Sequence, residues 1–256
     1  MTEVCPTSLW NAMVCPLVPY AIRGVIWYHG ESDATPDRAR RFGRDFAALV
    51  RNLRRDFGAA LPLVYVQIGR VLTFANDKNL EQHTSDAWDA VRDRQRALAD
   101  RIGNTEMTTA VDLELDNKIH LSSEALKMLG RRLALLAARR AYRVAGIAPG
   151  PRIVSIRHAV ESGRPCLDVL CRGVNGRLAA AGRPSGFSVF HADGTEAPVI
   201  KTRLKDRHTV RLYLHEPIAR GTLWYGKGPD PYCNIADERG LALPAGGPLQ
   251  LPARKS

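Results

Sequence analysis

The chain has 256 residues, of which 45% are hydrophobic, and 37 Lys and Arg against 26 Asp and Glu give it a formal net charge of +11. This apolar content is enough to build a buried core, so the composition excludes a disordered or fibrous chain. At about 150 residues per domain, the length predicts one or two domains.

The positive charge does not point to a nucleic-acid partner. The densest group of arginines, in residues 38–55, alternates with apolar residues at helical spacing, which is typical of the solvated face of an amphipathic helix. The sequence has no run of five or six Lys and Arg and no basic stripe interleaved with aromatic residues. Its apolar runs are far shorter than the roughly 18 residues of a membrane span, so we expect neither a nucleic-acid nor a membrane partner.

Residues 1–148 alternate short apolar runs with longer segments of helical period, which predicts an α/β domain with a mainly parallel sheet. We expect strands at 22–28, 61–68 and 107–113 and helices at 36–57 and 85–102. A third helix is expected to begin after Ser122 as N-cap. It should bury four leucines at spacings of three and four residues: Leu126, Leu129, Leu133 and Leu136.

The composition changes at residues 148–151, where the run Ala-Pro-Gly-Pro is a candidate domain boundary. Short strands separated by turn signals follow at intervals of about ten residues, which predicts a small β-sandwich domain over 151–256. The expected strands are 167–171, 186–191, 197–204, 209–214 and 222–225.

Two polar segments follow predicted strands of the α/β domain. The first is H-G-E-S-D at residues 29–33, and the second is D-L-E-L-D-N-K-I-H at residues 112–120. Ligands of open α/β sheets bind beyond the carboxyl ends of the strands, and a histidine with carboxylates nearby has the parts of a general base and its orienting acid. From spacing alone, a surface histidine and acidic residues that charge a helix N-terminus are the more common interpretation, and the catalytic one stays open beside it.

The residues of these segments resemble the sialate O-acetylesterase family, a group of SGNH-type carbohydrate esterases. Residues 9–34 are similar to its signature block, in which W-Y-Q-G-E-S-N is common and this chain has W-Y-H-G-E-S-D. Residues 88–95 are similar to its W-x-x-[LV]-R-x-x-Q helix, and His120 followed by G-R-R-L-A at 130–134 is similar to its histidine block. Weaker matches in 186–244 extend the resemblance from about Pro6 to Pro248.

The resemblance implies an SGNH-type, flavodoxin-like fold and the removal of acetyl groups from an O-acetylated carbohydrate by a Ser-His-acid mechanism, without cofactor or metal. It makes His120 the general base. The orienting acid is Glu31, which matches the family's glutamate, or Asp116, which is nearer in sequence. His29 and Gly30 are expected to line the oxyanion and substrate side.

Three departures from the family pattern change this expectation. The family takes its nucleophile from a G-Q-S-N motif, and this sequence contains none. Ser32 is a poor substitute, because the family has a serine there beside its true nucleophile. His29 stands in place of the usual glutamine, and Asn117 is the third residue before His120, where the family often has an aspartate.

The resemblance therefore implies an incomplete esterase domain, similar to the C-terminal portion of the family and inactive by itself. Its expected partner is an upstream chain segment or a second copy. The alternative is a non-catalytic remnant that binds acetylated glycan or a partner chain. A longer form with a signal peptide would be periplasmic or secreted.

Overall fold

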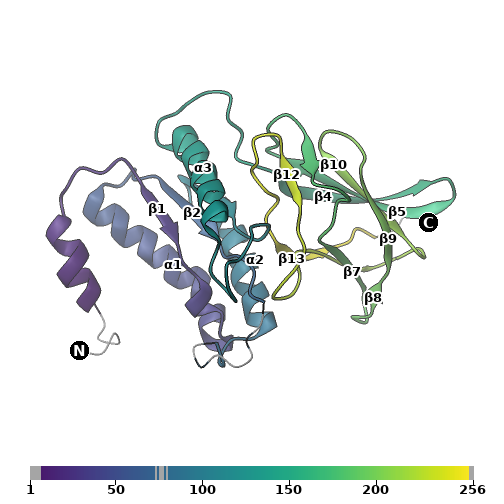
Figure 1. Cartoon of the computed structure of the whole chain (residues 1–256), viewed down its shortest axis with the longest axis horizontal. Coiled ribbons are helices and arrows are strands. Elements are labelled where there is room, and N and C mark those ends of the chain that lie inside the picture. The colour runs from purple at the N-terminus through teal and green to yellow at the C-terminus, as the bar shows by residue number, and fades with distance from the viewer. Residues whose placement is uncertain (1–6, 73, 75–77, 79, 254–256) are drawn as a thin grey trace.

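The computed structural model describes residues 7–72, 74, 78 and 80–253 (Figure 1). The first part of the chain forms a parallel sheet in the order β1-β2-β3, with helices packed against it. Its strands are β1 (Val25–Tyr28), β2 (Leu63–Gln67) and β3 (Thr105–Thr109), and its helices are α1 (Pro36–Phe57), α2 (Ser85–Arg101) and α3 (Ser123–Arg140). Three short helices are η1 (Trp10–Val14), η2 (Cys15–Leu17) and η3 (Glu31–Asp33).

The helices form where apolar periodicity and capping predict them. On α1, Phe42, Phe46 and Val50 are buried at spacings of four residues, while the arginines between them lie on the other face. On α3, the Ser122 hydroxyl accepts a hydrogen bond from the backbone N–H of Ala125, as an N-cap should. These elements therefore follow from local sequence.

Two expectations for this part of the chain are wrong. The third strand is Thr105–Thr109 and not 107–113, because the Thr109 hydroxyl accepts from the N–H of Val111 and the chain turns there. Leu126 is 52% exposed, whereas Leu129 and Leu136 are buried. Leu126 lies in the first turn of α3, where its side chain lines a cavity and is not part of the core.

Every element described after α3 is a strand. Two four-stranded antiparallel sheets, in the orders β4-β5-β10-β9 and β13-β11-β7-β8, share one apolar core, and β12 pairs with β6. The bounds are β4 (Arg152–Glu161), β5 (Arg164–Arg172), β6 (Leu178–Ala180), β7 (Phe187–His191), β8 (Glu196–Ala197), β9 (Val199–Leu204), β10 (Thr209–Leu214), β11 (Gly221–Tyr225), β12 (Ile235–Asp237) and β13 (Gly246–Gln250). The chain is thus a mixed α/β protein with parallel and antiparallel sheets.

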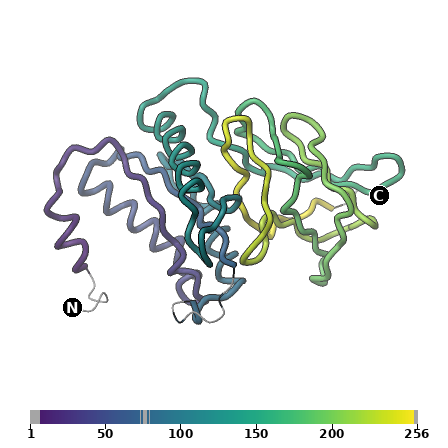
Figure 2. Tube along the Cα trace, viewed as in Figure 1, coloured from purple at the N-terminus to yellow at the C-terminus, as the bar shows by residue number. Residues whose placement is uncertain are grey.

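Some of these strands lack a clear sequence signal. The long strand β4 was not expected, because a register shift between Ile153 and Ser155 breaks the alternation that marks a strand. β12 and β6 have three residues each, too few for a period to emerge. Figure 2 shows how the last strands of the trace return to lie against the helices of the first part.

Buried hydrogen bonds join the antiparallel sheets to the parallel one. The Gln67 side-chain amide donates to the carbonyls of Arg92 at 2.8 Å and Ala245 at 2.7 Å. Its oxygen accepts from the N–H of Ala245 at 2.9 Å and from the Thr109 hydroxyl at 2.8 Å. Since all four groups are buried, the end of β2 is fixed against the segment that leads into β13.

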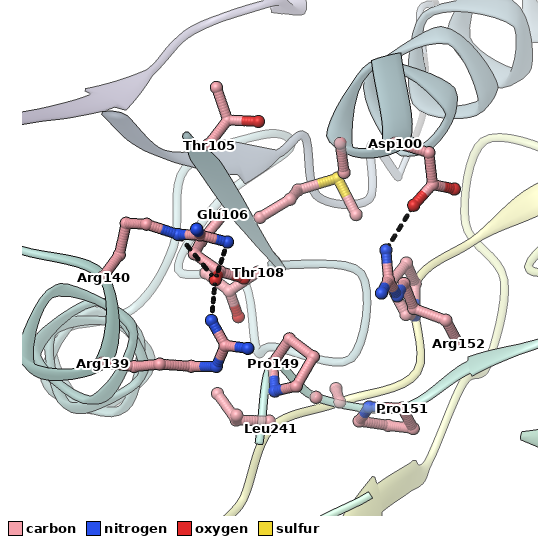
Figure 3. Close-up of a pocket in the computed structure, with 15 residues that line it drawn as sticks. Asp100, Thr105, Glu106, Thr108, Arg139, Arg140, Pro149, Pro151, Arg152 and Leu241 are labelled. Atoms are coloured by element: carbon pink, nitrogen blue, oxygen red, sulfur yellow. Dashed lines mark hydrogen bonds and ion pairs between the residues drawn. The ribbon is translucent and has the colours of Figure 1, made fainter. Parts of the chain in front are cut away.

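A cavity of about 250 Å³ lies at the same junction, between β3, the last turns of α2 and α3, and the linker before β4 (Figure 3). Arg139 and Arg140 both bind the buried carboxylate of Glu106, and Arg152 pairs with Asp100 on the other side. These pairs join α3 to β3 and α2 to the start of β4, so we interpret the cavity as part of the packing between the sheets.

None of the described helices is long and apolar enough to cross a membrane.

Candidate functional site

The loops that follow the two outer strands of the parallel sheet, β1 and β3, line a cavity of about 550 Å³. One loop follows β1, and the other connects β3 to α3. The lining residues are Tyr28, Glu31, Ser32, Leu80, His83, Ile119, His120, Leu121 and Leu126. Glu31 and His120, which are far apart in sequence, therefore line the same cavity.

A short turn orients the His120 imidazole. The side-chain oxygen of Asn117 accepts hydrogen bonds from the backbone N–H groups of Ile119 at 3.1 Å and His120 at 3.0 Å. The Nδ1 atom of His120 lies 3.1 Å from the same oxygen. Because an amide oxygen only accepts, Nδ1 is the donor in this contact, and in the neutral ring the lone pair is then on Nε2. The ring is thus prepared to take up a proton at Nε2.

Glu31 is half-buried at the start of η3 and lines the cavity. Burial, the largest cause, raises the pKa of Glu31 above its usual value, and hydrogen bonds from the N–H groups of Glu31 and Gly30 oppose this shift. The charge of His29 and a hydrogen bond with Tyr28 also favour the ionised carboxylate. Burial and the Glu31 charge in turn raise the pKa of the Tyr28 hydroxyl. A carboxyl group with a raised pKa in a cavity is typical of a functional site.

Asp116, the other candidate acid, has a different place. Its side chain is exposed and is not among the cavity-lining residues of the described structure. Its backbone N–H donates to the carbonyl of His120 at 2.8 Å. In the described part of the chain, the side-chain partner of the His120 ring is Asn117 rather than either carboxylate.

His29 and Gly30 lie beside the cavity. His29 is half exposed, with Nδ1 3.6 Å from a carboxylate oxygen of Asp33. Gly30 has a φ of +152°, and a Cβ there would come within 2.8 Å of the Gln95 amide nitrogen and of a methyl group of Ile68. Only glycine therefore fits at this position. The described lining of the cavity includes neither His29 nor Gly30.

The helix with the W-x-x-V-R-x-x-Q pattern holds the loops that carry the site. The Trp88 indole N–H donates to the carbonyl of Gly69 at 3.0 Å. The side chain of Gln95 accepts from the N–H of Ile68 at 2.9 Å and donates to the carbonyl of His29 at 3.1 Å. These residues act on the site through the backbone of the strand ends.

Sequence reasoning missed His83 and named Asn117 only as a departure from the family pattern. Nε2 of His83 lies 2.9 Å from the carbonyl oxygen of Glu31, and its ring packs against the rings of Phe74 and Trp88. His83 stands in a polar loop without a motif around it, so no local signal marks it. Asn117 had a signal, since a polar residue three positions before a histidine can form a turn that reaches back to the ring.

Replacing Glu31 with Gln is expected to stabilise the fold more at pH 7 than at pH 4. The folded pKa of Glu31 is raised, so wild-type stability falls as pH rises from the unfolded value through the folded one. Gln has no charge to bury and escapes this loss. Urea unfolding at both pH values measures the difference, with the exposed Glu196→Gln as control. An equal effect of both variants at both pH values would contradict the buried-charge explanation.

Residues 8–139 match the family model described as carbohydrate esterase, sialic acid-specific acetylesterase. The chain belongs to this family. The matched range includes the parallel sheet, the helices α1 and α2, nearly all of α3, and both loops of the cavity. The sialic acid-specific acetylesterase family is thus represented here by the part of the chain that carries Glu31 and His120.

Two known proteins are similar to this family member, and their matches cover different shares of the chain. A sialate O-acetylesterase from Rattus norvegicus is 29% identical over 114 residues, which cover 41% of this chain and 20% of the rat protein. The crystal structure of a carbohydrate acetylesterase from Xanthomonas citri superposes with a TM-score of 0.76 and 23% identity, covering 95% of this chain and 54% of that one. The chain therefore shares its fold with the bacterial enzyme but spans only about a fifth and about half of the two relatives.

Proposed function

We propose that the chain supplies the base and acid of a carbohydrate O-acetylesterase and acts on an O-acetylated sugar. The observation that carries the proposal is that Glu31 and His120 line one cavity, with Nδ1 of His120 3.1 Å from the Asn117 side-chain oxygen, which makes Nε2 the proposed proton acceptor. Asp116 is the weaker candidate acid, because its carboxylate is exposed and lies outside the cavity lining.

The proposed mechanism follows the Ser-His-acid pattern. A serine hydroxyl attacks the acetyl carbonyl while Nε2 of His120 takes its proton, and the same proton then passes to the sugar oxygen as it leaves. Asn117 holds the imidazole through Nδ1, and the Glu31 carboxylate, when ionised, stabilises the imidazolium electrostatically. Backbone N–H groups near His29 and Gly30 are the proposed donors to the oxyanion. Water then releases acetate from the serine.

The serine itself is proposed to come from a segment with a G-Q-S-N block, in a longer form or a separate chain. Ser32 lines the cavity, but in the described residues its hydroxyl has no hydrogen bond to His120. Its carbonyl accepts from the Arg38 guanidinium at 3.1 Å, which supports a structural role. The strands after α3 are proposed to form a β-sandwich that packs on the esterase part as an accessory.

The purified chain is expected to release acetate from p-nitrophenyl acetate no faster than its His120→Ala variant. A base and an acid cannot form an acyl-enzyme, and the members of a triad act as a unit. Addition of a segment with the G-Q-S-N block should produce turnover, and His120→Ala should then reduce kcat by at least about 1,000-fold. Asn117→Ala should reduce kcat less than His120→Ala does, since it removes the group that orients the imidazole but leaves His120 as the base.

Two results would change this conclusion. Turnover by the chain alone that Ser32→Ala abolishes would make Ser32 the nucleophile. Binding of acetylated glycan without turnover, in the presence of the added segment, would support a binding remnant instead. Circular dichroism of each variant checks that the fold is intact.

A further inference from the structure

The sheet β4-β5-β10-β9 has one apolar and one charged face. Leu167, Val169, Val210 and Leu212 point into the shared core. Their neighbours along the strands point the other way, because successive residues of a strand alternate between faces. The outward face therefore carries most of the charged residues of these four strands.

Cross-strand register places four charged residues in one row on this face. Arg157 pairs with Asp168, Asp168 with Arg211, and Arg211 with Arg203. The row crosses all four strands and is about 14 Å wide at roughly 4.8 Å per strand. In this row Arg211 and Arg203 are direct cross-strand neighbours with like charges, and the Glu161 carboxylate binds both.

Neighbouring rows add more cations than carboxylates. Tyr213 pairs with Lys201 on β9, and Glu161 pairs with Arg164 across the β4-β5 turn. The six cations of the face are Arg157, Arg164, Lys201, Arg203, Lys205 and Arg211, and its two carboxylates are Asp168 and Glu161. Six positive against two negative charges leave an excess of four positive charges on one sheet face.

Some of these cations form no ion pair with a carboxylate in the described structure. Asp168 is shared by Arg211 and Lys205, and Glu161 is shared by Arg211 and Arg203. Arg157 and Arg164 are exposed and have no carboxylate partner in the described structure. Lys201 contacts only the Tyr213 ring, 5.5 Å from its centroid, among the described interactions. Three exposed cations are thus available to an external anion.

We infer that this face binds an anionic polysaccharide, with carboxylated sugars facing Arg157, Arg164 and Lys201. The flat, multiply charged surface suits an extended polymer with regularly spaced carboxylates. The choice of a carbohydrate rests on the proposed function, whereas the charge complementarity does not. Figure 1 places β5, β9 and β10 at the opposite end of the molecule from α1, so the polymer would be held apart from the helical part of the chain.

Nucleic acid fits the same face less well. Proteins that bind single strands stack bases on exposed aromatic rings between their basic residues. The aromatic residue of the charged rows, Tyr213, is only 6% exposed, and its ring is flanked by Lys201 and Arg203. The face therefore offers charges to a polyanion but no platform for bases.

Affinity electrophoresis in gels that contain polygalacturonate or neutral xylan tests the inference. We expect polygalacturonate but not xylan to retard the protein, and about 0.5 M salt to remove the effect by screening. The variant Arg157→Gln/Arg164→Gln/Lys201→Gln should bind at least about tenfold more weakly. The matched control Arg40→Gln/Arg41→Gln/Arg44→Gln removes three exposed charges from α1 and should change binding less than about twofold.

Three outcomes would overturn the inference. They are no retardation by polygalacturonate, equal losses in both triple variants, and stronger binding to duplex or single-stranded DNA than to polygalacturonate. Binding is measured without acetyl groups on the polymer, so a failure of the esterase proposal leaves this result unchanged. Thermal unfolding of both variants excludes a loss of structure as the cause.

Discussion

Replacing Arg92 with Met is expected to lower the free energy of unfolding by about 3–5 kcal/mol, the loss seen when one partner of a buried ion pair is removed. Arg92 is 1% exposed. Its guanidinium donates to the carbonyls of Gly69 and Gly228, both at 2.6 Å, and of Pro229 at 3.2 Å. It therefore ties the end of β2 to the loop before β12, and Met can replace its volume but none of these hydrogen bonds.

The carboxylate of Asp89 adds to the expected loss. Asp89 is 4% exposed, 3.6 Å from Arg92, and both of its oxygens accept from the N–H of Gly228 at 3.0 Å. Burial raises the pKa of Asp89 and the nearby guanidinium opposes this shift, so removal of Arg92 leaves a buried charge with less compensation. The double variant Asp89→Asn/Arg92→Met should therefore lose less than the sum of the two single variants.

Urea unfolding followed by circular dichroism measures these differences. The control is Arg101→Met, which removes an exposed arginine at the end of the same helix and should change stability by less than about 0.5 kcal/mol. Similar decreases in the free energy of unfolding for Arg92→Met and Arg101→Met would show that the burial and hydrogen bonds of the Arg92 guanidinium contribute little to stability.

The second large effect concerns the edge of the parallel sheet. We expect the chain to form dimers or larger assemblies through β1, which pairs only with β2 among the described strands. Ile26, in the middle of β1, is 57% exposed. Val25 and Trp27, on either side of it, are partly buried and pack against the core cluster that includes residues of α1. The exposed apolar surface is therefore on the opposite face of the strand.

A charge at this edge should prevent the association. Ile26→Lys is expected to convert the assemblies to monomers, because a lysine on an edge strand opposes pairing with another chain. Light scattering at several protein concentrations measures the mass. Val144→Lys, a change at an exposed apolar residue outside the strands, should leave the assemblies unchanged. A wild-type monomer at all concentrations would contradict the prediction, as would equal effects of the two variants.

The same edge is where an added segment with the G-Q-S-N block is expected to bind. If it pairs with β1, it should compete with self-association and lower the scattering of the wild-type chain. Ile26→Lys should then also weaken activation by the segment, while His120→Ala should abolish activity without affecting binding. This contrast separates assembly of the sheet from chemistry in the cavity.

The sequence determined the features that depend on neighbours within one or two turns. The spacing of Phe42, Phe46 and Val50 was enough for α1, and the Ser122 hydroxyl was enough for the start of α3. The position of Glu31 and His120 at strand ends also followed, because parallel strands align their carboxyl ends whatever their exact register. The resemblance to the family pointed to the same two residues, Glu31 through residues 9–34 and His120 through the histidine block with residues 130–134.

Only the tertiary structure decided the environment of these residues. Burial of Glu31 depends on segments such as the His83 loop, and the partner of His120 depends on how the 112–120 loop turns. The strand Thr105–Thr109 is rich in polar residues, and its burial comes from packing by distant elements. Desolvation and hydrogen bonding between distant segments leave no period in the sequence, because they arise only when the chain has folded.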